Sequence, residues 1–182
     1  MISAEHRKMN YSDVSIKIFS GGTPSTSRKE YWGGNNNWLS SGETRNWFIY
    51  DTEKTITDKG IIESSTKLAK KGDTVVASAG QGKTRGQVAF LEIDTYINQS
   101  IIAIRPNTEI VEPLWIFYDL SNRYDELRQM SDTSSIRGSL TTVDFKSMKL
   151  FVPPIITQRK IISILKSLDD KIERNRQTNA TL

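Results

Sequence analysis

Residues 157–182 read TQRKIISILKSLDDKIERNRQTNATL, and this stretch decides the architecture of the chain. It contains neither glycine nor proline, so nothing in it interrupts a helix. Steps of four and three residues alternate along one series of positions: Ile161, Leu165, Leu168, Ile172, Asn175, Asn179 and Leu182. This spacing is typical of a coiled-coil seam. We therefore predict a C-terminal helix about 39 Å long, since each residue of a helix rises about 1.5 Å.

The seam has two interpretations. A helix that docks on its own domain usually presents a broader apolar face than this one. Asparagines on a seam, here Asn175 and Asn179, set register and partner choice in coiled coils. Because no internal repeat is visible, we expect the helix to pair with another chain.

Upstream of Pro153-Pro154 the composition changes, and we predict a globular domain over residues 1–152 followed by the helix over 153–182. The expected fold class is α/β (α+β) with a β-rich core. Strands are predicted where apolar residues alternate or run together: Val14–Ile18, Thr74–Ser78, Gln87–Glu92, Tyr96–Ile104 and Lys149–Val152. The short connection at Glu92–Thr95 predicts a hairpin.

Two polar stretches, residues 25–37 and 131–139, are predicted to be surface loops. Pro113 is expected to begin a helix, in the position where its missing N–H costs nothing. Helical spacing places one face of this helix in the core: Leu114, Phe117, Leu120, Tyr124 and Leu127.

Composition excludes several classes of protein. The 182 residues include no cysteine and one histidine, His6, which excludes disulfides, cysteine-based zinc sites and cysteine nucleophiles. No apolar run reaches the length of a membrane span, and no signal peptide opens the chain, so we expect a cytoplasmic protein. The formal charge of +4 fits a nucleic-acid partner without requiring one.

Several short segments follow one another in a recognisable order. They are GGTPS (21–25), YW (31–32), WLSSG (38–42), ITDKGI (56–61), SSTKL (64–68), KGD (71–73), GQVA (86–89), INQS (97–100), Pro153-Pro154 with Gln158, and LDDKIE (168–173). This set resembles the target recognition domain and spacer helix of the specificity (S) subunit of type I restriction-modification systems. Each motif alone is weak, but the resemblance covers nearly the whole chain.

The resemblance implies DNA recognition without catalysis. Such subunits usually carry two domain–helix units, whereas this chain carries one, so we expect a natural half-subunit or half of a longer protein. A second copy would pair antiparallel through the C-terminal helix, which acts as a ruler between two DNA half-sites arranged as an inverted repeat. The resemblance also implies methyltransferase (M) subunits carrying S-adenosylmethionine and restriction (R) subunits using ATP, with no cofactor in this chain.

Three polar segments carry side chains that could contact DNA. Gln and Asn suit adenine, and Arg and Lys suit guanine; glycines at 80, 82, 86 and 138 permit close backbone approach. The candidates are Thr26, Ser27, Arg28, Lys29 and Asn36 in the first segment, Gln81, Lys83, Thr84 and Arg85 in the glycine loop (residues 79–86), and Ser134, Ser135 and Arg137 in the third. Ordinary solvated turns are the competing interpretation.

Parts of the sequence suggest other functions. Tyr31, Trp32, Trp38 and Trp47 could stack on bases, although such residues more often anchor loops on a core. The glycine loop lacks the spacing of a P-loop. A Mg²⁺-dependent nuclease using Asp73, Gln81 and Lys83 lacks a second carboxylate nearby. A coiled-coil adaptor that binds protein predicts no salt-dependent affinity for DNA.

Overall fold

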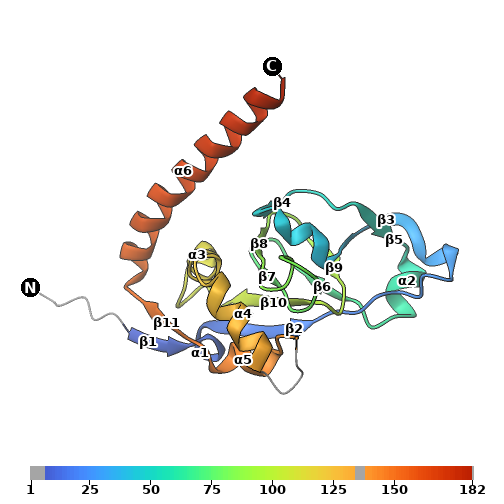
Figure 1. Cartoon of the computed structure of the whole chain (residues 1–182), viewed down its shortest axis with the longest axis horizontal. Coiled ribbons are helices and arrows are strands. Elements are labelled where there is room, and N and C mark those ends of the chain that lie inside the picture. The colour runs from blue at the N-terminus through green and yellow to red at the C-terminus, as the bar shows by residue number, and fades with distance from the viewer. Residues whose placement is uncertain (1–6, 134–137, 182) are drawn as a thin grey trace, which may run out of the picture.

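Strand β10 (Ile101–Pro106) lies between two antiparallel neighbours, β2 (Ser15–Ser20) and β7 (Thr74–Ala77). Strand β8 (Val88–Leu91) pairs antiparallel with β7, and β4 (Phe48–Ile49) adds in parallel at the edge, so the order is β2-β10-β7-β8-β4. The structure is a computed structural model that describes residues 7–133 and 138–181 (Figure 1).

Apolar side chains cover both faces of this sheet. On one face Val76 and Ile104 pack with Phe117 of helix α3 (Pro113–Ser121). On the other face Val75 packs in a second cluster with Leu39, which belongs to another sheet. Because both faces of the sheet are covered, β7 (Thr-Val-Val-Ala) is buried along its length and shows no alternation of buried and exposed residues.

The second sheet has the order β5-β3-β9-β6, and a third pairs the two ends of the domain. Its strands are β5 (Lys54–Ile56), β3 (Trp32–Leu39), β9 (Thr95–Ile97) and β6 (Lys67–Ala69), and the third sheet joins β1 (Arg7–Asn10) to β11 (Lys149–Val152). The remaining elements are α1 (Tyr11–Val14), the 3₁₀ helices η1 (Lys29–Tyr31) and η2 (Ser41–Arg45), α2 (Asp58–Ile62), α4 (Tyr124–Thr133), α5 (Thr142–Ser147) and α6 (Ile155–Thr181).

The predicted strands at Thr74–Ser78, Gln87–Glu92 and Lys149–Val152 are confirmed as β7, β8 and β11. The strand predicted over Val14–Ile18 is β2, but it begins at Ser15, and Ile16 is exposed where alternation placed it in the core.

The single strand predicted over Tyr96–Ile104 is wrong, because the chain turns at Asn98 and separates β9 from β10. Asn98 accepts the Ser100 N–H on its side chain at 3.1 Å and the Ile101 N–H on its carbonyl at 3.3 Å. The hairpin predicted between β8 and β9 is wrong as well: β9 pairs with β3 and β6 in the other sheet.

Two predicted boundaries also change. Residues 25–37 are not one loop, since Tyr31 is buried in η1 and β3 starts at Trp32. The helix that begins at Pro113 ends at Ser121, and α4 resumes at Tyr124 and runs to Thr133, into the second predicted loop. The predicted helical face largely holds: Phe117, Leu120 and Leu127 are buried, and Leu114 and Tyr124 are half-buried.

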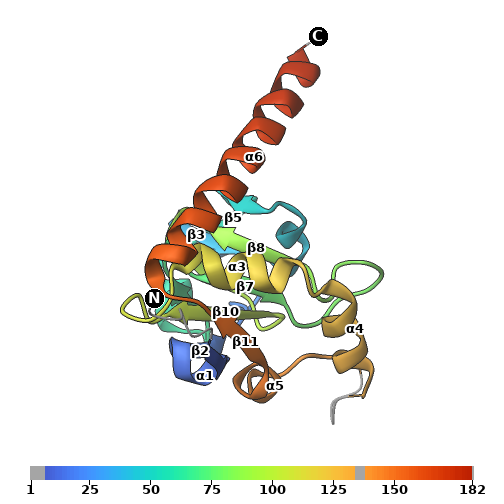
Figure 2. The same cartoon turned by 90° about the vertical axis from the view of Figure 1, so that its left-hand side faces the viewer.

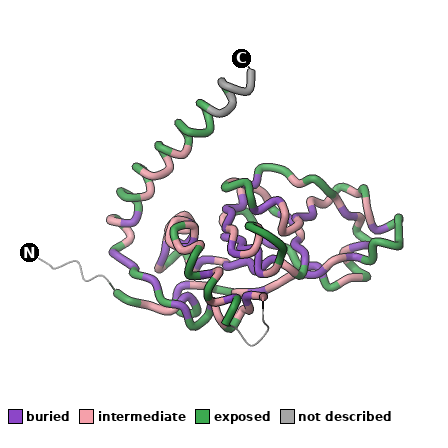
Figure 3. The backbone as a smooth tube through the Cα atoms, viewed as in Figure 1, coloured by how far each residue is buried: buried purple, intermediate pink, exposed green. Residues whose placement is uncertain are grey.

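Helix α6 begins at Ile155, directly after Pro154, and extends away from the body of the domain (Figure 2). Its first turns lie beside α3, whereas its outer part is exposed along its length (Figure 3). The mixed α/β fold class is confirmed. In the described part of the chain, no helix combines the length and hydrophobicity that crossing a membrane requires.

Candidate nucleic-acid interface

The glycine loop leaves the sheet between β7 and β8, and its shape depends on glycine. Gly80, Gly82 and Gly86 have φ angles of 147°, 60° and 88°, a region that side chains with a Cβ rarely adopt. The loop is closed at its base, where the Gly86 N–H donates to the Ala77 carbonyl at 2.8 Å. The side chains of Gln81 and Lys83 are exposed at its outer part, and Thr84 is half-buried.

Helix α4 holds this loop from one side. Tyr124 donates its hydroxyl to the Lys83 carbonyl at 2.9 Å, and Arg128 donates Nη1 to the Gly82 carbonyl at 2.8 Å. Arg85 turns inward and forms an ion pair with Asp132 at 2.6 Å. The loop backbone is thereby anchored while Gln81 and Lys83 face solvent. Arg85, predicted to contact DNA, is instead mostly buried against α4.

A cleft of about 260 Å³ lies beside the glycine loop, and its lining combines two cations with polar side chains. Lys83 comes from the loop, Arg45 from the end of η2, and Tyr124 from α4. The remaining lining residues are Thr44, Trp47, Gly86, Gln87, Val88 and Ser121. Arg45 is exposed and pairs with Glu53 at 2.8 Å. Sequence reasoning missed Arg45, Thr44 and Gln87, because their approach to the loop depends on the tertiary fold.

The third predicted segment adjoins the same loop. Gly138 donates its N–H to the Ser131 carbonyl at 2.9 Å, and a Cβ placed on Gly138 would lie 3.1 Å from Arg85 Nη1. The candidates Ser134, Ser135 and Arg137 lie outside the described residues, as does His6. The structure therefore brings together the glycine loop and the two flanks of the third segment.

The first segment lies elsewhere. Figure 1 shows α2 and β3 at the right-hand end of the molecule, whereas α4 lies near its middle. Arg28 pairs with Glu63 at 3.1 Å and bonds the Tyr31 hydroxyl at 2.5 Å. A hydrogen bond from Tyr31, together with the charges of Lys59 and Arg28, holds the pKa of Glu63 below its usual value.

The other candidates of this segment divide into two groups. Asn36 donates to Asp58 at 2.9 Å and to the Ile56 carbonyl at 3.2 Å, so it holds β3 against α2. Thr26, Ser27 and Lys29 are exposed. Arg28 is exposed as well, although its guanidinium is paired with Glu63.

Most of the aromatic candidates anchor the fold. Tyr31 and Trp38 are buried, and Trp32 packs edge-on against Trp38 with ring centroids 5.0 Å apart. Trp47 differs, since half of its surface is exposed at the rim of the cleft. The prediction that these residues mainly serve the core is therefore confirmed for Tyr31 and Trp38.

The nuclease alternative fails on the position of Asp73. Its carboxylate is almost fully buried and accepts three hydrogen bonds from Arg105, the shortest at 2.8 Å. Asp73 precedes β7 and the glycine loop follows it, so a strand about 13 Å long lies between this carboxylate and the loop that carries Gln81 and Lys83.

A second candidate surface runs along α6. Ile161, Ile164, Leu168 and Ile172 are exposed by 38%, 62%, 54% and 50%, and we call these four residues the apolar stripe. Leu165, which the spacing placed on the seam, is half-buried toward the domain, and Ile164 takes its place in the stripe. Asn175 is exposed near the same side, whereas the Asn179 side chain and Leu182 lie outside what the structure describes.

Comparison with known proteins identifies relatives over nearly the whole chain. Residues 7–182 match the family described as Type I restriction modification DNA specificity domain. The specificity subunit of the type I restriction enzyme MjaIX of Methanocaldococcus jannaschii is 30% identical over 173 residues, or 91% of this chain and 38% of that protein. The EcoR124I/EcoR124II specificity subunit of Escherichia coli is 29% identical over 84% of this chain and 38% of that protein. This chain thus spans less than half of either relative.

Solved structures share the fold. A chain from a study of the assembly of the type I R-M system matches 99% of this chain and 42% of its own length, with a TM-score of 0.74 at 17% identity. The HsdS subunit from Thermoanaerobacter tengcongensis matches 98% of this chain and 40% of its own length, with a TM-score of 0.67 at 16% identity.

Proposed function

The chain belongs to the type I restriction modification DNA specificity domain family, and we propose that it reads one half of a bipartite double-stranded DNA site. The observation that carries this proposal is the anchored glycine loop. Tyr124 and Arg128 bond its backbone carbonyls, and Gln81 and Lys83 face solvent. A rigid loop presenting an amide and an ammonium group suits hydrogen bonding to base edges in the major groove.

The neighbouring cleft supplies the second requirement of a DNA reader. Contacts to phosphate position a protein on the duplex, while contacts to bases specify the sequence. Arg45 and Lys83 flank the cleft beside the loop. We assign Arg45 to phosphate and Gln81 and Lys83 to bases, with Thr26, Ser27 and Lys29 available for outlying backbone contacts. The chain contributes binding, not catalysis.

The apolar stripe on α6 supports pairing with a second specificity unit. Four aliphatic side chains are exposed on one side of a projecting helix, and one of them, Ile172, also lines a cavity between α6 and the domain. Burying them against an equivalent helix would remove apolar surface from water. In the proposed arrangement two copies pair antiparallel in a coiled coil, and the DNA site is an inverted repeat.

The proposed assembly works in the cytoplasm with further subunits. Methyltransferase (M) subunits would carry S-adenosylmethionine, and restriction (R) subunits would use ATP, while this chain would hold no cofactor. Capture of a methyltransferase subunit by the tagged chain from its native lysate supports this part of the proposal. A captured chain free of any methyltransferase would contradict it.

The proposed function is tested by selecting sites from a random duplex library, with the parent chain and its captured methyltransferase. We expect an inverted repeat, and a relaxed or changed repeat when Gln81 and Lys83 are both replaced by alanine. The solution mass of the variant should equal that of the parent. Unchanged selection by the variant would overturn the assignment of the loop. A parent that shows no salt-dependent binding to DNA would favour a protein-binding adaptor.

A further inference from the structure

The joint between the domain and α6 contains a fully buried glutamine. Gln158 accepts the Glu112 N–H on its side-chain oxygen at 2.8 Å. Its side-chain nitrogen donates to the Pro153 carbonyl at 2.8 Å and to the Ile110 carbonyl at 3.3 Å. These bonds hold the start of α6 on the domain, so a change in the direction of the helix would rotate it about this point.

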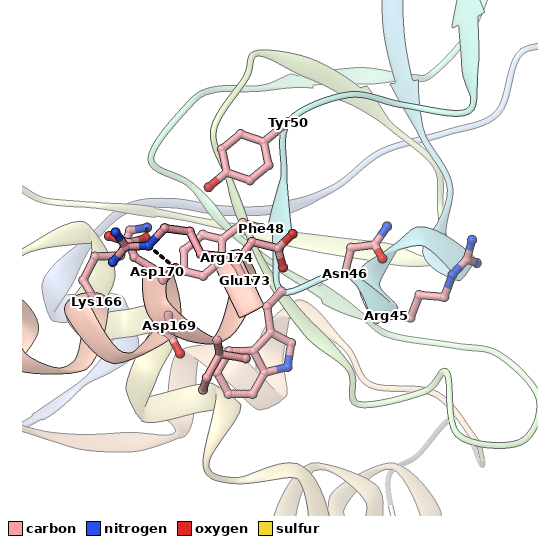
Figure 4. A pocket seen from close by; sticks show the side chains of 11 residues that line it. Arg45, Asn46, Phe48, Tyr50, Lys166, Asp169, Asp170, Glu173 and Arg174 are labelled. Atoms are coloured by element: carbon pink, nitrogen blue, oxygen red, sulfur yellow. Dashed lines mark hydrogen bonds and ion pairs between the residues drawn. The ribbon is translucent and has the colours of Figure 1, made fainter. Parts of the chain in front are cut away.

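A second set of contacts lies about three turns further along α6. Tyr118 of α3 donates its hydroxyl to Asp169 at 2.6 Å. Lys166 lies over the ring of Phe48 at 4.5 Å from its centroid and pairs with Asp170 at 2.5 Å. Figure 4 shows Lys166, Asp169 and Asp170 on the helix beside a cavity of about 710 Å³ that separates α6 from the Arg45–Tyr50 segment. Ile172, Glu173 and Arg174, in the next turn of the helix, line the same cavity.

We propose that the Tyr118–Asp169 hydrogen bond and the Lys166–Phe48 contact fix the direction of α6, and with it the spacing between the two DNA half-sites. Gln158 and Asp169 lie about 17 Å apart along the helix axis, so the helix is held at two separated levels and by two different elements. This inference rests on the proposed function, because spacing has meaning only in a paired reader.

The geometry shows why small changes in direction matter. From Gln158 to Thr181 the helix is about 35 Å long, so a tilt of about 10° moves its end by about 6 Å. Base pairs are stacked about 3.4 Å apart, so this displacement of the helix end corresponds to nearly two base-pair steps. A hydrogen bond suits this role, since it weakens over a few tenths of an ångström, whereas an apolar contact tolerates sliding.

The direction of α6 is measured by spin-label distances. The chain has no cysteine, so Lys67→Cys on β6 and Thr178→Cys on α6 place single labels on two exposed positions. The labelled chain is mixed with excess unlabelled chain to exclude distances between copies. We expect one narrow distance distribution for the parent, and a broadening or shift of about 6 Å for Tyr118→Phe and for Asp169→Ala. Asp125→Asn, an exposed substitution on α4, is the control. Equal distributions for all variants would overturn the inference.

The effect on DNA is measured in a library of inverted repeats whose half-sites are separated by variable spacers. The parent should select one spacing, and Tyr118→Phe should accept several spacings while reading the same half-site sequence. If the substitution only destabilised the protein, the variant would instead bind less tightly to repeats of every spacing. Broadened distances with unchanged spacing would overturn the link to DNA. If the parent selects no repeat, the proposed function is wrong, and so is the inferred link between helix direction and half-site spacing. The spin-label distances would still show whether Tyr118 and Asp169 fix the direction of α6.

Discussion

Arg85 of the glycine loop and Asp132 of α4 form an ion pair of 2.6 Å that joins the base of the loop to the helix beside it. The arginine side chain is only 13% exposed, so its charge is satisfied mainly by this partner. A residue type that suits guanine contact thus serves here to hold the loop. Asp132, although mostly exposed, becomes a determinant of loop position.

Replacing Asp132 by alanine should lower the free energy of unfolding by about 1 kcal/mol, since a largely buried guanidinium loses its partner. We also expect relaxed base preference, because the loop gains alternative positions. Chemical denaturation and site selection measure the two effects. Asp125→Ala removes an exposed carboxylate from the same helix and should change neither; equal effects of the two variants would contradict the role of the pair.

Lys83 and Gln81 should differ in what they contribute to DNA binding. Lys83→Ala removes a cation that we assign to base contact, so base preference should relax, affinity should fall and the slope of binding against salt should decrease by about one ion. Gln81→Ala removes no charge, and base preference should relax at constant salt slope. Lys67→Ala, on the far sheet, serves as the charge control. Binding titrations over a range of salt concentrations decide the matter, and identical slopes for Lys83→Ala and Lys67→Ala would contradict the assignment.

The sequence predicted those parts of the fold that depend on local pattern. β7 has a run of three apolar residues, and α6 has a regular spacing without glycine or proline, so both could be found. The division of 96–104 into two strands could not, because it depends on hydrogen bonds at Asn98 and on which sheet offers a free edge. The partner of each strand depends on contacts between segments far apart in the sequence, and the local periodicity of the sequence gives no information about such contacts.

The candidate site shows the same division. Glycines and polar side chains identified the glycine loop, but the same residue types can read a base or hold a turn. Arg28, Asn36 and Arg85 each have protein partners in the structure. Arg45 was missed, since only the fold brings η2 to the loop. On α6, spacing alone could not distinguish Leu165 from Ile164, because the domain covers one side of the helix.

The paired glycines of the GGTPS segment are predicted to be essential for packing. A Cβ on Gly21 would lie 1.9 Å from the Ile97 carbonyl oxygen, so Gly21→Ala must displace backbone in β9. We expect a loss of about 3 kcal/mol in the free energy of unfolding. The control is Gly42→Ala, where the nearest atom is 3.8 Å away and the stability should be nearly unchanged. Denaturation curves that coincide for the two variants would show that the strands can separate at little cost.

The contact between Tyr118 of α3 and Asp169 of α6 should weaken at alkaline pH. Burial, together with the hydrogen bond to Asp169, raises the pKa of Tyr118 above its usual value. A group whose pKa is raised by folding stabilises fully below its unfolded pKa of about 10, and that contribution is lost as the pH rises further. The stability advantage of the parent over Tyr118→Phe should therefore shrink above about pH 10. Denaturation at pH 8 and at pH 11 tests this, and a constant advantage would contradict it. Burial also raises the pKa of Tyr11, but Tyr11 is present in both proteins, so its contribution cancels in the difference between their stabilities.

The apolar stripe makes the sharpest prediction for assembly. Leu168→Glu places a charge among Ile164, Leu168 and Ile172, where pairing would bury it, and such burial is costly unless the charge finds a partner. We expect the variant to have the mass of a single chain in solution. Ser167→Glu adds the same charge one residue earlier, about 100° around the helix, and should leave the paired mass unchanged. A single-chain mass for both variants would point to general damage to the helix. A paired mass for Leu168→Glu would show that α6 meets its partner through another face, and the antiparallel arrangement would then have to be abandoned.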